Sequence, residues 1–234
     1  TLGPALERIG LARRTGEAEG VTLVRPGLIR TLGDEGNDSR ILDYCDSLAK
    51  AYLEDPASID PSLSSAAIAL SAIRGDLALY EVYKKRFETT ENPAERSRFL
   101  GALGYFREPR IVDQSIRYSI EGPLRPQEMF TIPGTLAQAL EYEEVPYKWM
   151  TENYPAIASR LPPMFLVYMP RLCGGCSVKR LLAARAFFAD EAHRVPGTEK
   201  ELAKVFDQVN DCAGLRDREG AAVVRYLNEF MNAK

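Results

Sequence analysis

The stretch that decides the fold is SLSSAAIALSAIRGDLALYEVYKKRF, residues 62–87. Its first half is apolar on nearly every side of a helix, which predicts a helix over residues 62–74 that is buried on several sides. Gly75 is a natural stop for this helix, and Asp76 can cap the next one. That next helix carries an apolar stripe made of Leu79, Tyr80, Val82, Tyr83 and Phe87. Because the link between them is short, the two helices are expected to pack as antiparallel neighbours.

Helical patterns with clear start signals continue on both sides of this stretch. Asp38 precedes an amphipathic stripe that ends at Asp55-Pro56, and Asn92-Pro93 with Glu95 is a strong helix start. No segment alternates apolar and polar residues between turn signals, as a half-buried strand would. The best strand candidate, Val21–Val24, runs into a helical pattern.

These patterns predict an all-α chain of about a dozen helices, each of ~10–15 residues. Helix pairs of roughly 30–45 residues with short links predict an irregular HEAT/armadillo-like α-α superhelix, or solenoid. Since no clean repeat is visible, a general α bundle is the alternative. The length allows one or two domains, and we expect a single domain over residues 1–234.

Three features of the second half affect where helices begin and end. Pro133-Gly134 should kink or unwind a helix over residues 127–140, and Pro155 should separate two short helical pieces. A capping box at Thr198 starts an amphipathic helix that reaches Val209, and a last helix is expected over about residues 218–230.

The composition is that of an ordinary globular chain. Of 234 residues, 45% are apolar and 27% charged, and 30 Lys and Arg face 33 Asp and Glu for a net charge of −3. This near balance argues against a dedicated nucleic-acid binder. No apolar run approaches the ~20 residues needed to cross a bilayer. The chain begins at Thr1 without a signal-peptide pattern and reads like a piece of a longer protein, so it leaves the compartment open.

The four cysteines are Cys45, Cys173, Cys176 and Cys212. Cys173 and Cys176 have the C-x-x-C spacing, but no strand precedes them as a thioredoxin-like motif requires, and a zinc site would need a second ligand pair. We expect two thiols in a glycine turn, with a redox pair or a metal site as the alternatives.

Catalytic motifs are missing from the sequence. With His193 as its single histidine, the chain cannot build a His-Glu-x-x-His zinc site, and serine or cysteine catalysis normally needs a histidine base. His193 lies near a helix end, where it is expected to interact with the helix's last carbonyls or to be solvated. We therefore predict no catalytic residue and no metal ligand in this chain.

Several segments, taken in order, resemble one known family. They are AIRGDLALYEVY (72–83), NPAERSRFLGALGYFREPRIVDQSIRYSI (92–120), LRPQEMF (124–130), YKWMTENYPAI (147–157) and FFADEAHRVPG (187–197). Together they resemble the C-terminal helical domain of the aminopeptidase N family of zinc metallopeptidases, which includes the endoplasmic-reticulum aminopeptidases. The chain departs from the family pattern at LEYEEV (140–145), which replaces an Asn-Pro-x-Gly signature, and at Cys173–Cys176.

The resemblance implies a helical superhelix that closes over a catalytic domain lying upstream in the same chain. Zinc and its ligands would belong to that upstream domain, and this chain would need no cofactor of its own. The parent would be a zinc-dependent aminopeptidase (a metallopeptidase, hence a hydrolase) that removes N-terminal residues from peptides. This chain would be non-catalytic, would cap the active-site chamber, and would help to bind the distal part of peptide substrates.

The candidate substrate-binding residues are Arg125, Gln127, Glu128, Tyr105 and Arg107. An arginine fork suits a carboxylate, but Arg125 and Glu128 could equally pair with each other or hold a helix start. Trp149 and Tyr154 are expected to pack in the core rather than to contact substrate.

Two other function classes stay open on the sequence alone. One is a free-standing helical-repeat adaptor that binds a protein partner, and the other is an α-helical redox protein that uses Cys173 and Cys176.

Overall fold

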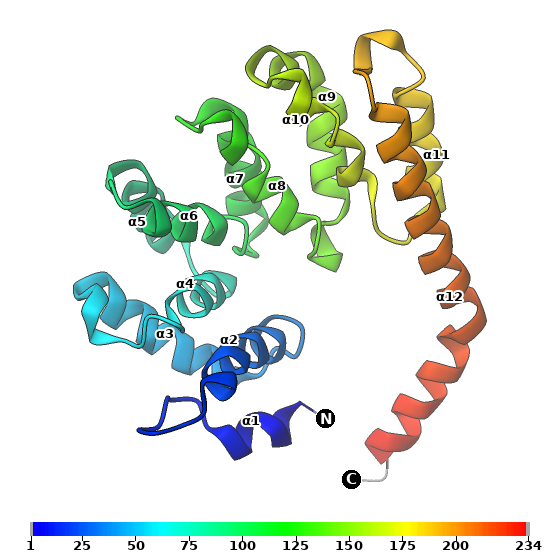
Figure 1. Ribbon diagram of the computed structural model, residues 1–234. Helices are drawn as coiled ribbons and strands as arrows, with labels where there is room; N and C mark the ends of the chain where they lie inside the picture. The colour runs from blue at the N-terminus through cyan, green and yellow to red at the C-terminus, as the bar shows by residue number, and fades with distance from the viewer. Residues whose placement is uncertain (1, 233–234) are drawn as a thin grey trace. The chain divides into compact units, whose positions relative to one another are not determined.

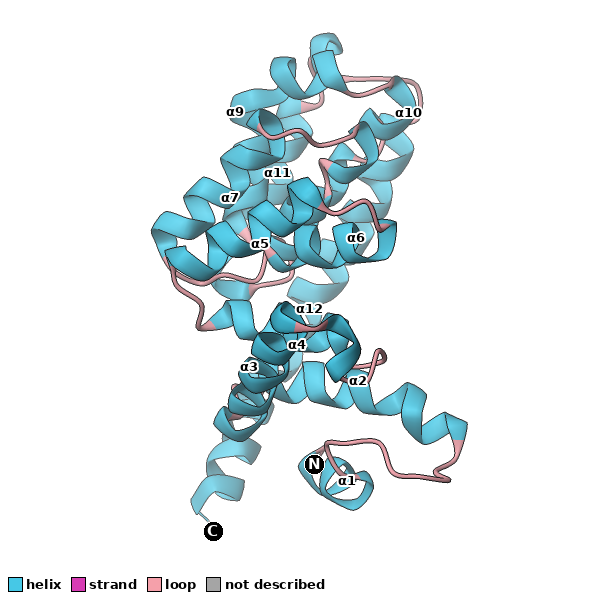
Figure 2. Cartoon of the chain, turned by 90° about the vertical axis from the view of Figure 1, so that its left-hand side faces the viewer, coloured by secondary structure: helices cyan, strands magenta, loops and turns pink. Residues whose placement is uncertain are grey.

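The computed structural model describes residues 2–232, and within them it contains helices and no strand (Figures 1 and 2). The predicted all-α class is therefore confirmed. The α-helices are α1 (Gly3–Ile9), α2 (Glu19–Asp34), α3 (Ser39–Glu54), α4 (Ser64–Ile73), α5 (Leu77–Thr89), α6 (Pro93–Ala102), α7 (Pro109–Glu121), α8 (Thr131–Leu136), α9 (Glu144–Arg160), α10 (Pro163–Leu166), α11 (Val178–Phe187) and α12 (Thr198–Asn232). Short 3₁₀ turns are η1 (Pro56–Ser58), η2 (Pro126–Glu128), η3 (Leu140–Tyr142), η4 (Met169–Cys173) and η5 (Glu191–His193).

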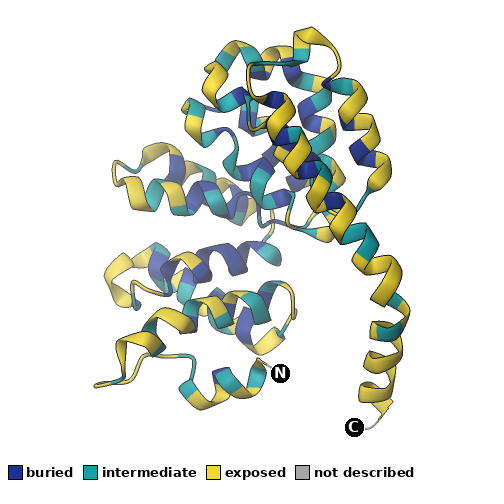
Figure 3. Cartoon of the chain, turned by 45° about the vertical axis from the view of Figure 1, so that its right-hand side comes forward, coloured by how far each residue is buried: buried dark blue, intermediate teal, exposed yellow. Residues whose placement is uncertain are grey.

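The chain forms two compact units, unit 1 (Thr1–Tyr118) and unit 2 (Ser119–Lys234). In each unit the buried residues face neighbouring helices, whereas most of the second half of α12 is exposed (Figure 3). None of the described helices is long and apolar enough to cross a membrane. The solenoid and the single domain stay predictions.

Helix α4 is the centre of unit 1. It packs most closely against α3, α2 and α6, while α5 packs on α6. We expected the helix over residues 62–74 to pack against the next helix as its antiparallel neighbour, and this prediction is wrong for the main contacts. Helix α4 packs chiefly on α3, and α5 packs chiefly on α6. Because α4 is apolar on nearly all sides, it needs several neighbours rather than one partner.

Small residues allow the close packing around α4. A Cβ atom on Gly33 of α2 would lie only 2.6 Å from Cδ1 of Leu70 in α4, so α2 and α4 approach each other closely at this point. On the other side, the Ser71 hydroxyl and the Tyr83 hydroxyl are 2.6 Å apart, and the Tyr83 ring lies 5.3 Å from that of Phe99. This aromatic contact joins α5 to α6.

A buried ion pair holds the beginning of unit 1 together. Arg25 of α2 is fully buried and donates hydrogen bonds to both carboxylate oxygens of Glu17, at 2.7 and 2.5 Å. It also donates to the carbonyl oxygens of Gly10 (2.9 Å) and Ile9 (3.3 Å), where α1 ends. One guanidinium thus ties α1 and the following loop to α2, and it holds the pKa of Glu17 at about 2, down from 4.5.

Buried arginines have the same role in unit 2. Arg180 of α11 forms ion pairs with Glu143 and Glu144 at the start of α9, and it donates to the Gly174 carbonyl oxygen. Arg160, in the last turn of α9, donates to the carbonyl oxygens of Ile120, Gly122 (3.4 Å) and Leu124 (2.8 Å). These contacts fix the loops around α9.

Aromatic residues of α9 and α11 form the core between these helices. Trp149 and Tyr154 are buried, as expected for core residues. The His193 ring stacks on Phe187, with centroids 3.9 Å apart, and its Nδ1 lies 3.0 Å from the Phe187 carbonyl oxygen in the last turn of α11. This is the contact with a helix end that we expected for His193, and it assigns the histidine a packing role.

The proline prediction is confirmed at one site and wrong at the other. The helix expected over residues 127–140 is interrupted near Thr131: turn η2 ends at Glu128, and helix α8, which contains Pro133-Gly134, begins only at Thr131. Pro155, however, lies inside the continuous helix α9. The proline ring removes one hydrogen bond from the turn before it, but packing of the flanking residues against the core holds the helix together.

The two helices expected at the C-terminus are a single one, α12. Gly214, which lies between the two expected helices, does not adopt the positive φ that ends many helices. No proline follows it in α12, so nothing in the local sequence stops the helix.

We expected Cys173 and Cys176 to be two thiols in a glycine turn, and this is wrong for Cys176. Cys176 forms a disulfide with Cys212, whose Cα atoms are 5.1 Å apart, whereas Cys45 and Cys173 are free and buried. Burial raises the pKa of both free thiols to about 12, which makes them unreactive near neutral pH. The disulfide fastens the middle of α12 to the loop before α11.

We predict that Arg25→Met lowers the free energy of unfolding by about 3–5 kcal/mol, because it leaves Glu17 and the end of α1 without their buried partner. Urea denaturation at neutral pH would measure this loss. Arg117→Met is the matched control: Arg117 is 61% exposed and pairs only with Asp113, so its loss should cost no more than about 0.5 kcal/mol. Equal effects of the two substitutions would contradict the role of Arg25.

The low pKa of Glu17 predicts a pH dependence of stability. A carboxyl whose folded-state pKa lies below its unfolded value stabilises the fold above pH 4.5, and this contribution is lost as the pH falls toward about 2. Between about pH 6 and pH 3, the urea midpoint of the natural chain should therefore fall further than that of Glu17→Gln. Parallel losses in the two proteins would argue against the ionised pair.

The disulfide predicts a defined thiol count. The denatured but unreduced chain should expose two thiols, from Cys45 and Cys173, and the reduced chain all four. Cys212→Ser should destabilise the fold by about 3–4 kcal/mol, the loop entropy expected for a sequence separation of 36 residues. Cys45→Ala is the control that keeps the bridge, and four reactive thiols without reductant would exclude the disulfide.

Candidate functional site

The five residues predicted to bind substrate fall into two groups. Arg125, Gln127 and Glu128 lie together in unit 2, in and just before η2. Glu128 accepts a hydrogen bond at 2.8 Å from the Arg125 backbone N–H, so its carboxylate holds the start of this turn. This is the structural role that the sequence left open for the pair.

Tyr105 and Arg107 lie in unit 1, directly after α6. The Arg107 guanidinium donates to Asp34 of α2 at 3.2 Å and lies 5.8 Å from the centre of the Tyr105 ring. Arg107 therefore links α2 to the segment after α6, and its charge is balanced by Asp34.

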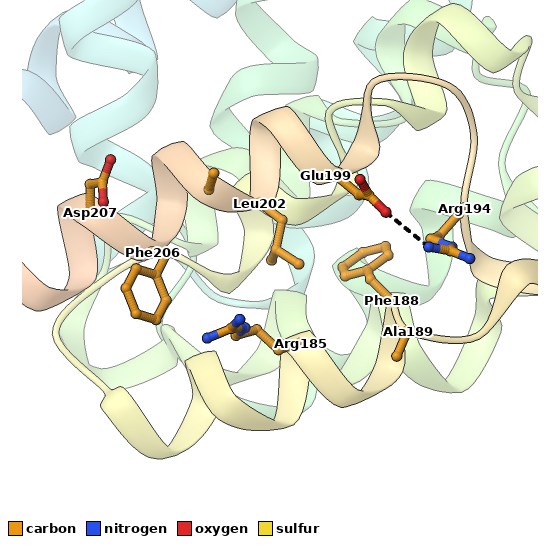
Figure 4. Close-up of a pocket in the computed structure, with 9 residues that line it drawn as sticks. Arg185, Phe188, Ala189, Arg194, Glu199, Leu202, Phe206 and Asp207 are labelled. Carbon is orange, nitrogen blue, oxygen red and sulfur yellow. Dashed lines mark hydrogen bonds and ion pairs between the residues drawn. The ribbon is translucent and has the colours of Figure 1, made fainter.

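Unit 2 contains a cleft between α11 and α12, with a volume of about 480 Å³ (Figure 4). We call it the α11–α12 cleft. Its lining residues are Arg185, Phe188 and Ala189 from α11 and its end, Arg194 from the following loop, and Glu199, Leu202, Ala203, Phe206 and Asp207 from α12. Leu202 and Phe206 are half-buried and Phe188 is buried, and charged side chains of both signs flank this apolar part of the cleft.

Local sequence explains why α12 presents these residues. Gly197 has a φ of 98°, and the Thr198 hydroxyl accepts a hydrogen bond at 3.1 Å from the Val195 N–H, which sets the start of the helix. Val205 and Val209 are buried one turn apart, so Leu202 and Phe206 fall on the neighbouring, half-buried face toward α11.

Two contacts fix α12 on either side of the cleft. Glu201 accepts hydrogen bonds from Lys204 and, at 3.0 Å, from Arg171 of η4, and these bonds lower the pKa of its carboxyl. Further along, the Cys176–Cys212 disulfide holds the helix to the loop before α11. The cleft therefore has walls that are joined at several points.

The charges of the cleft divide into a paired and an unpaired set. Arg194 forms an ion pair with Glu199 at 3.0 Å, whereas Arg185 lies over the Phe206 ring, 5.0 Å from its centre (Figure 4). Among the residues that the structure describes, neither Arg185 nor Asp207 has an ion-pair partner. A free cation and a free anion beside an apolar surface are groups that can bind the backbone and one side chain of a peptide.

Sequence reasoning missed this cleft. The apolar residues at Leu202 and Phe206 were visible as part of a helical stripe, but a stripe does not show which of its members stay partly exposed. No signal in the sequence places Arg185 over Phe206, because the two residues are brought together only by the packing of α11 on α12.

No metal site is formed by the described part of the chain: residues 2–232 contain no cluster of three or more His, Cys, Asp or Glu side chains that could hold a metal ion.

Comparison of the sequence with known proteins finds one matching domain family and several related aminopeptidases. The family model described as the ERAP1-like C-terminal domain matches residues 1–211. Aminopeptidase 2, mitochondrial, of Saccharomyces cerevisiae is 24% identical over 191 residues, which are 80% of this chain and 19% of the relative. Aminopeptidase M1-A of Oryza sativa subsp. japonica is 25% identical over 173 residues, 71% of this chain and 19% of the relative.

A third relative, the alanine/arginine aminopeptidase of Saccharomyces cerevisiae, is 28% identical over 156 residues, 63% of this chain and 18% of the relative. The chain thus spans about a fifth of the length of the curated aminopeptidases that it matches. The family match covers both units up to the disulfide-bearing turn of α12. This chain therefore belongs to the family of ERAP1-like C-terminal domains and is a C-terminal domain of the aminopeptidase N family.

Proposed function

We propose that this chain is the non-catalytic C-terminal domain of a zinc aminopeptidase, that it caps the active-site chamber of the parent enzyme, and that it helps to bind the distal part of peptide substrates. The observation that carries the proposal is the family match over residues 1–211, in a chain that spans 19% of a curated aminopeptidase. The rest of such a parent would contain the catalytic domain and its zinc, and that domain and the peptide would be the partners of this chain.

The α11–α12 cleft supports the peptide-binding part of the proposal. An apolar peptide side chain would lie on Leu202 and Phe206, the half-buried apolar residues of the cleft, and burying it would contribute about 1.5–3 kcal/mol. The Arg185 guanidinium would donate hydrogen bonds to a peptide carbonyl or carboxylate oxygen. The Asp207 carboxylate would accept from a peptide N–H.

These contacts would hold a peptide without changing it chemically. A surface of this size gives weak binding, because most of the interaction energy offsets the loss of freedom of the peptide. Weak binding suits a domain that holds the distal part of a substrate while bond cleavage takes place elsewhere, since the product must leave after each cycle.

The experiment measures binding of a fluorescein-labelled nonapeptide with an apolar side chain to the 234-residue chain by fluorescence anisotropy. Arg185→Glu and Phe206→Ala should each weaken binding about tenfold, because they remove a charged donor and part of the apolar surface. Arg218→Glu, which makes the same charge change on α12 outside the cleft, is the matched control and should alter binding less than about twofold.

Two results would contradict the proposal. Absence of peptide binding at millimolar concentration would remove the binding role. Chelator-sensitive hydrolysis of a leucyl anilide by the purified chain would show that it is catalytic by itself.

A further inference from the structure

A hollow of about 350 Å³ lies within unit 1, between α3, the end of α4 and the start of α5. We call it the α3–α5 hollow. Its lining residues are Asp46, Ala49, Lys50 and Leu53 of α3, Ser71 of α4, Arg74, Gly75 and Asp76 of the link, and Leu79 and Tyr83 of α5. None of them lines the α11–α12 cleft, so this hollow is independent of the peptide-binding role proposed above.

The lining of the hollow changes from buried to charged and exposed. The buried lining residues are Ala49, Ser71 and Tyr83, each at most 4% exposed. Leu53 and Leu79 are half-buried and supply an apolar surface. The fully exposed lining residues are all charged, and they are Lys50, Arg74 and Asp76. A ligand in this hollow would therefore meet apolar and hydroxyl groups inside and charges at the opening.

The Asp46 carboxylate borders the hollow without a close partner. Arg74 lies 3.7 Å away, too far for a hydrogen bond, and its guanidinium makes its short contact, of 2.8 Å, with Asp43 instead. Among the residues that the structure describes, none donates a hydrogen bond to the Asp46 carboxylate. Burial raises the pKa of this carboxyl. A half-buried carboxylate that lacks hydrogen-bond donors favours a cationic group as ligand.

The Tyr83 hydroxyl supplies a second acceptor. Ser71 Oγ lies 3.1 Å from the Ile68 carbonyl oxygen and 2.6 Å from Tyr83 Oη. Both bonds form together only if Ser71 donates to the carbonyl and Tyr83 donates to Ser71, because each hydroxyl has one hydrogen. The Tyr83 oxygen therefore keeps a free lone pair. Burial, and to a smaller extent the charge of Asp46, raises the pKa of Tyr83 to about 12, so this hydroxyl stays neutral.

Lys50 places a cation one helical turn away from Asp46. The two residues are four positions apart on α3, so they share a face of this helix, with Cβ atoms about 5–6 Å apart. Within the part of the chain that the structure describes, Lys50 forms no ion pair with Asp46 or with another acid. Ala49 and Leu53 lie on the same face of α3. This face thus presents an acceptor, a donor and an apolar surface side by side.

The link between α4 and α5 is held in place before any ligand binds. Asp76 caps α5 by accepting a hydrogen bond at 3.0 Å from the Leu79 N–H. A Cβ atom on Gly75 would lie only 2.6 Å from Cε1 of Phe106, so the link packs tightly against that ring. A site whose walls are already ordered loses little entropy on binding.

We propose that the α3–α5 hollow binds a free α-amino acid with an apolar side chain. Asp46 and Tyr83 accept hydrogen bonds from its ammonium, Lys50 pairs with its carboxylate, and Leu53 and Leu79 cover its side chain. A diamine would bring a second cation toward Lys50, and a simple carboxylic acid would bring a second anion toward Asp46. A zwitterion alone matches both charges of the hollow.

The experiment is isothermal titration calorimetry of the 234-residue chain with L-leucine and two analogues at constant ionic strength. 3-Methylbutylamine lacks the carboxylate, and N-acetyl-L-leucine lacks the ammonium. We expect L-leucine to bind in the millimolar range or tighter, the amine to bind more weakly, and N-acetyl-L-leucine to give no detectable binding. No binding of L-leucine at tens of millimolar, or equal affinities for L-leucine and N-acetyl-L-leucine, would overturn the proposal.

Substitution of Asp46 tests whether the ammonium binds in this hollow. Asp46→Asn should weaken binding of both L-leucine and 3-methylbutylamine about tenfold or more, the effect of losing a charged acceptor. Asp113→Asn makes the same change on α7, at a side chain that is 67% exposed and outside the hollow, and should alter both affinities less than about twofold. Equal effects of the two substitutions would place the binding elsewhere and overturn the proposal.

Substitution of Lys50 tests the carboxylate end separately. Lys50→Gln should weaken binding of L-leucine about fivefold to tenfold and change that of 3-methylbutylamine less than about twofold, because the amine has no group that contacts Lys50. Lys85→Gln, at an exposed position of α5 outside the hollow, is the matched control and should leave both affinities unchanged. Thermal unfolding checks that each variant is folded, and equal losses for the two ligands in Lys50→Gln would overturn the proposal.

Discussion

A helix without a polar face has to be covered by other helices, and unit 1 is arranged around this constraint on α4. Residues Ala66 to Ala72 of α4 are at most 4% exposed, and α2, α3 and α6 all pack against this helix. Its alanines allow these neighbours to approach closely, as the contact between Gly33 and Leu70 shows.

Arginines serve two distinct purposes in this protein. Arg25, Arg160 and Arg180 donate to backbone carbonyl oxygens, and they hold loops and helix ends in place. Loops carry unpaired carbonyl groups, and a guanidinium with five donors can satisfy several of them at once. Arg185 is different, because it borders the α11–α12 cleft and has no ion-pair partner among residues 2–232. This difference, rather than the number of arginines, separates the structural positions from the candidate binding position.

The α11–α12 cleft has an apolar part and carries both charges, which supports the peptide-binding role proposed for it. None of the five candidate substrate-binding residues singled out from the sequence lines this cleft. Tyr105 and Arg107 lie together after α6 in unit 1, whereas Arg125, Gln127 and Glu128 lie at a turn in unit 2.

The sequence by itself determined the helical class, most helix starts and the family. Asp38, Asp76 and Asn92 cap α3, α5 and α6 as predicted, because a cap depends on residues within one turn of the chain. Only the tertiary structure decided the Cys176–Cys212 pairing, the partners of α4 and the residues of the α11–α12 cleft. Arg30 meets Tyr105 across 75 positions and Arg98 meets Ser65 across 33, and such contacts follow from how helices pack. Periodicity shows which face of a helix is apolar, but not which neighbour covers it.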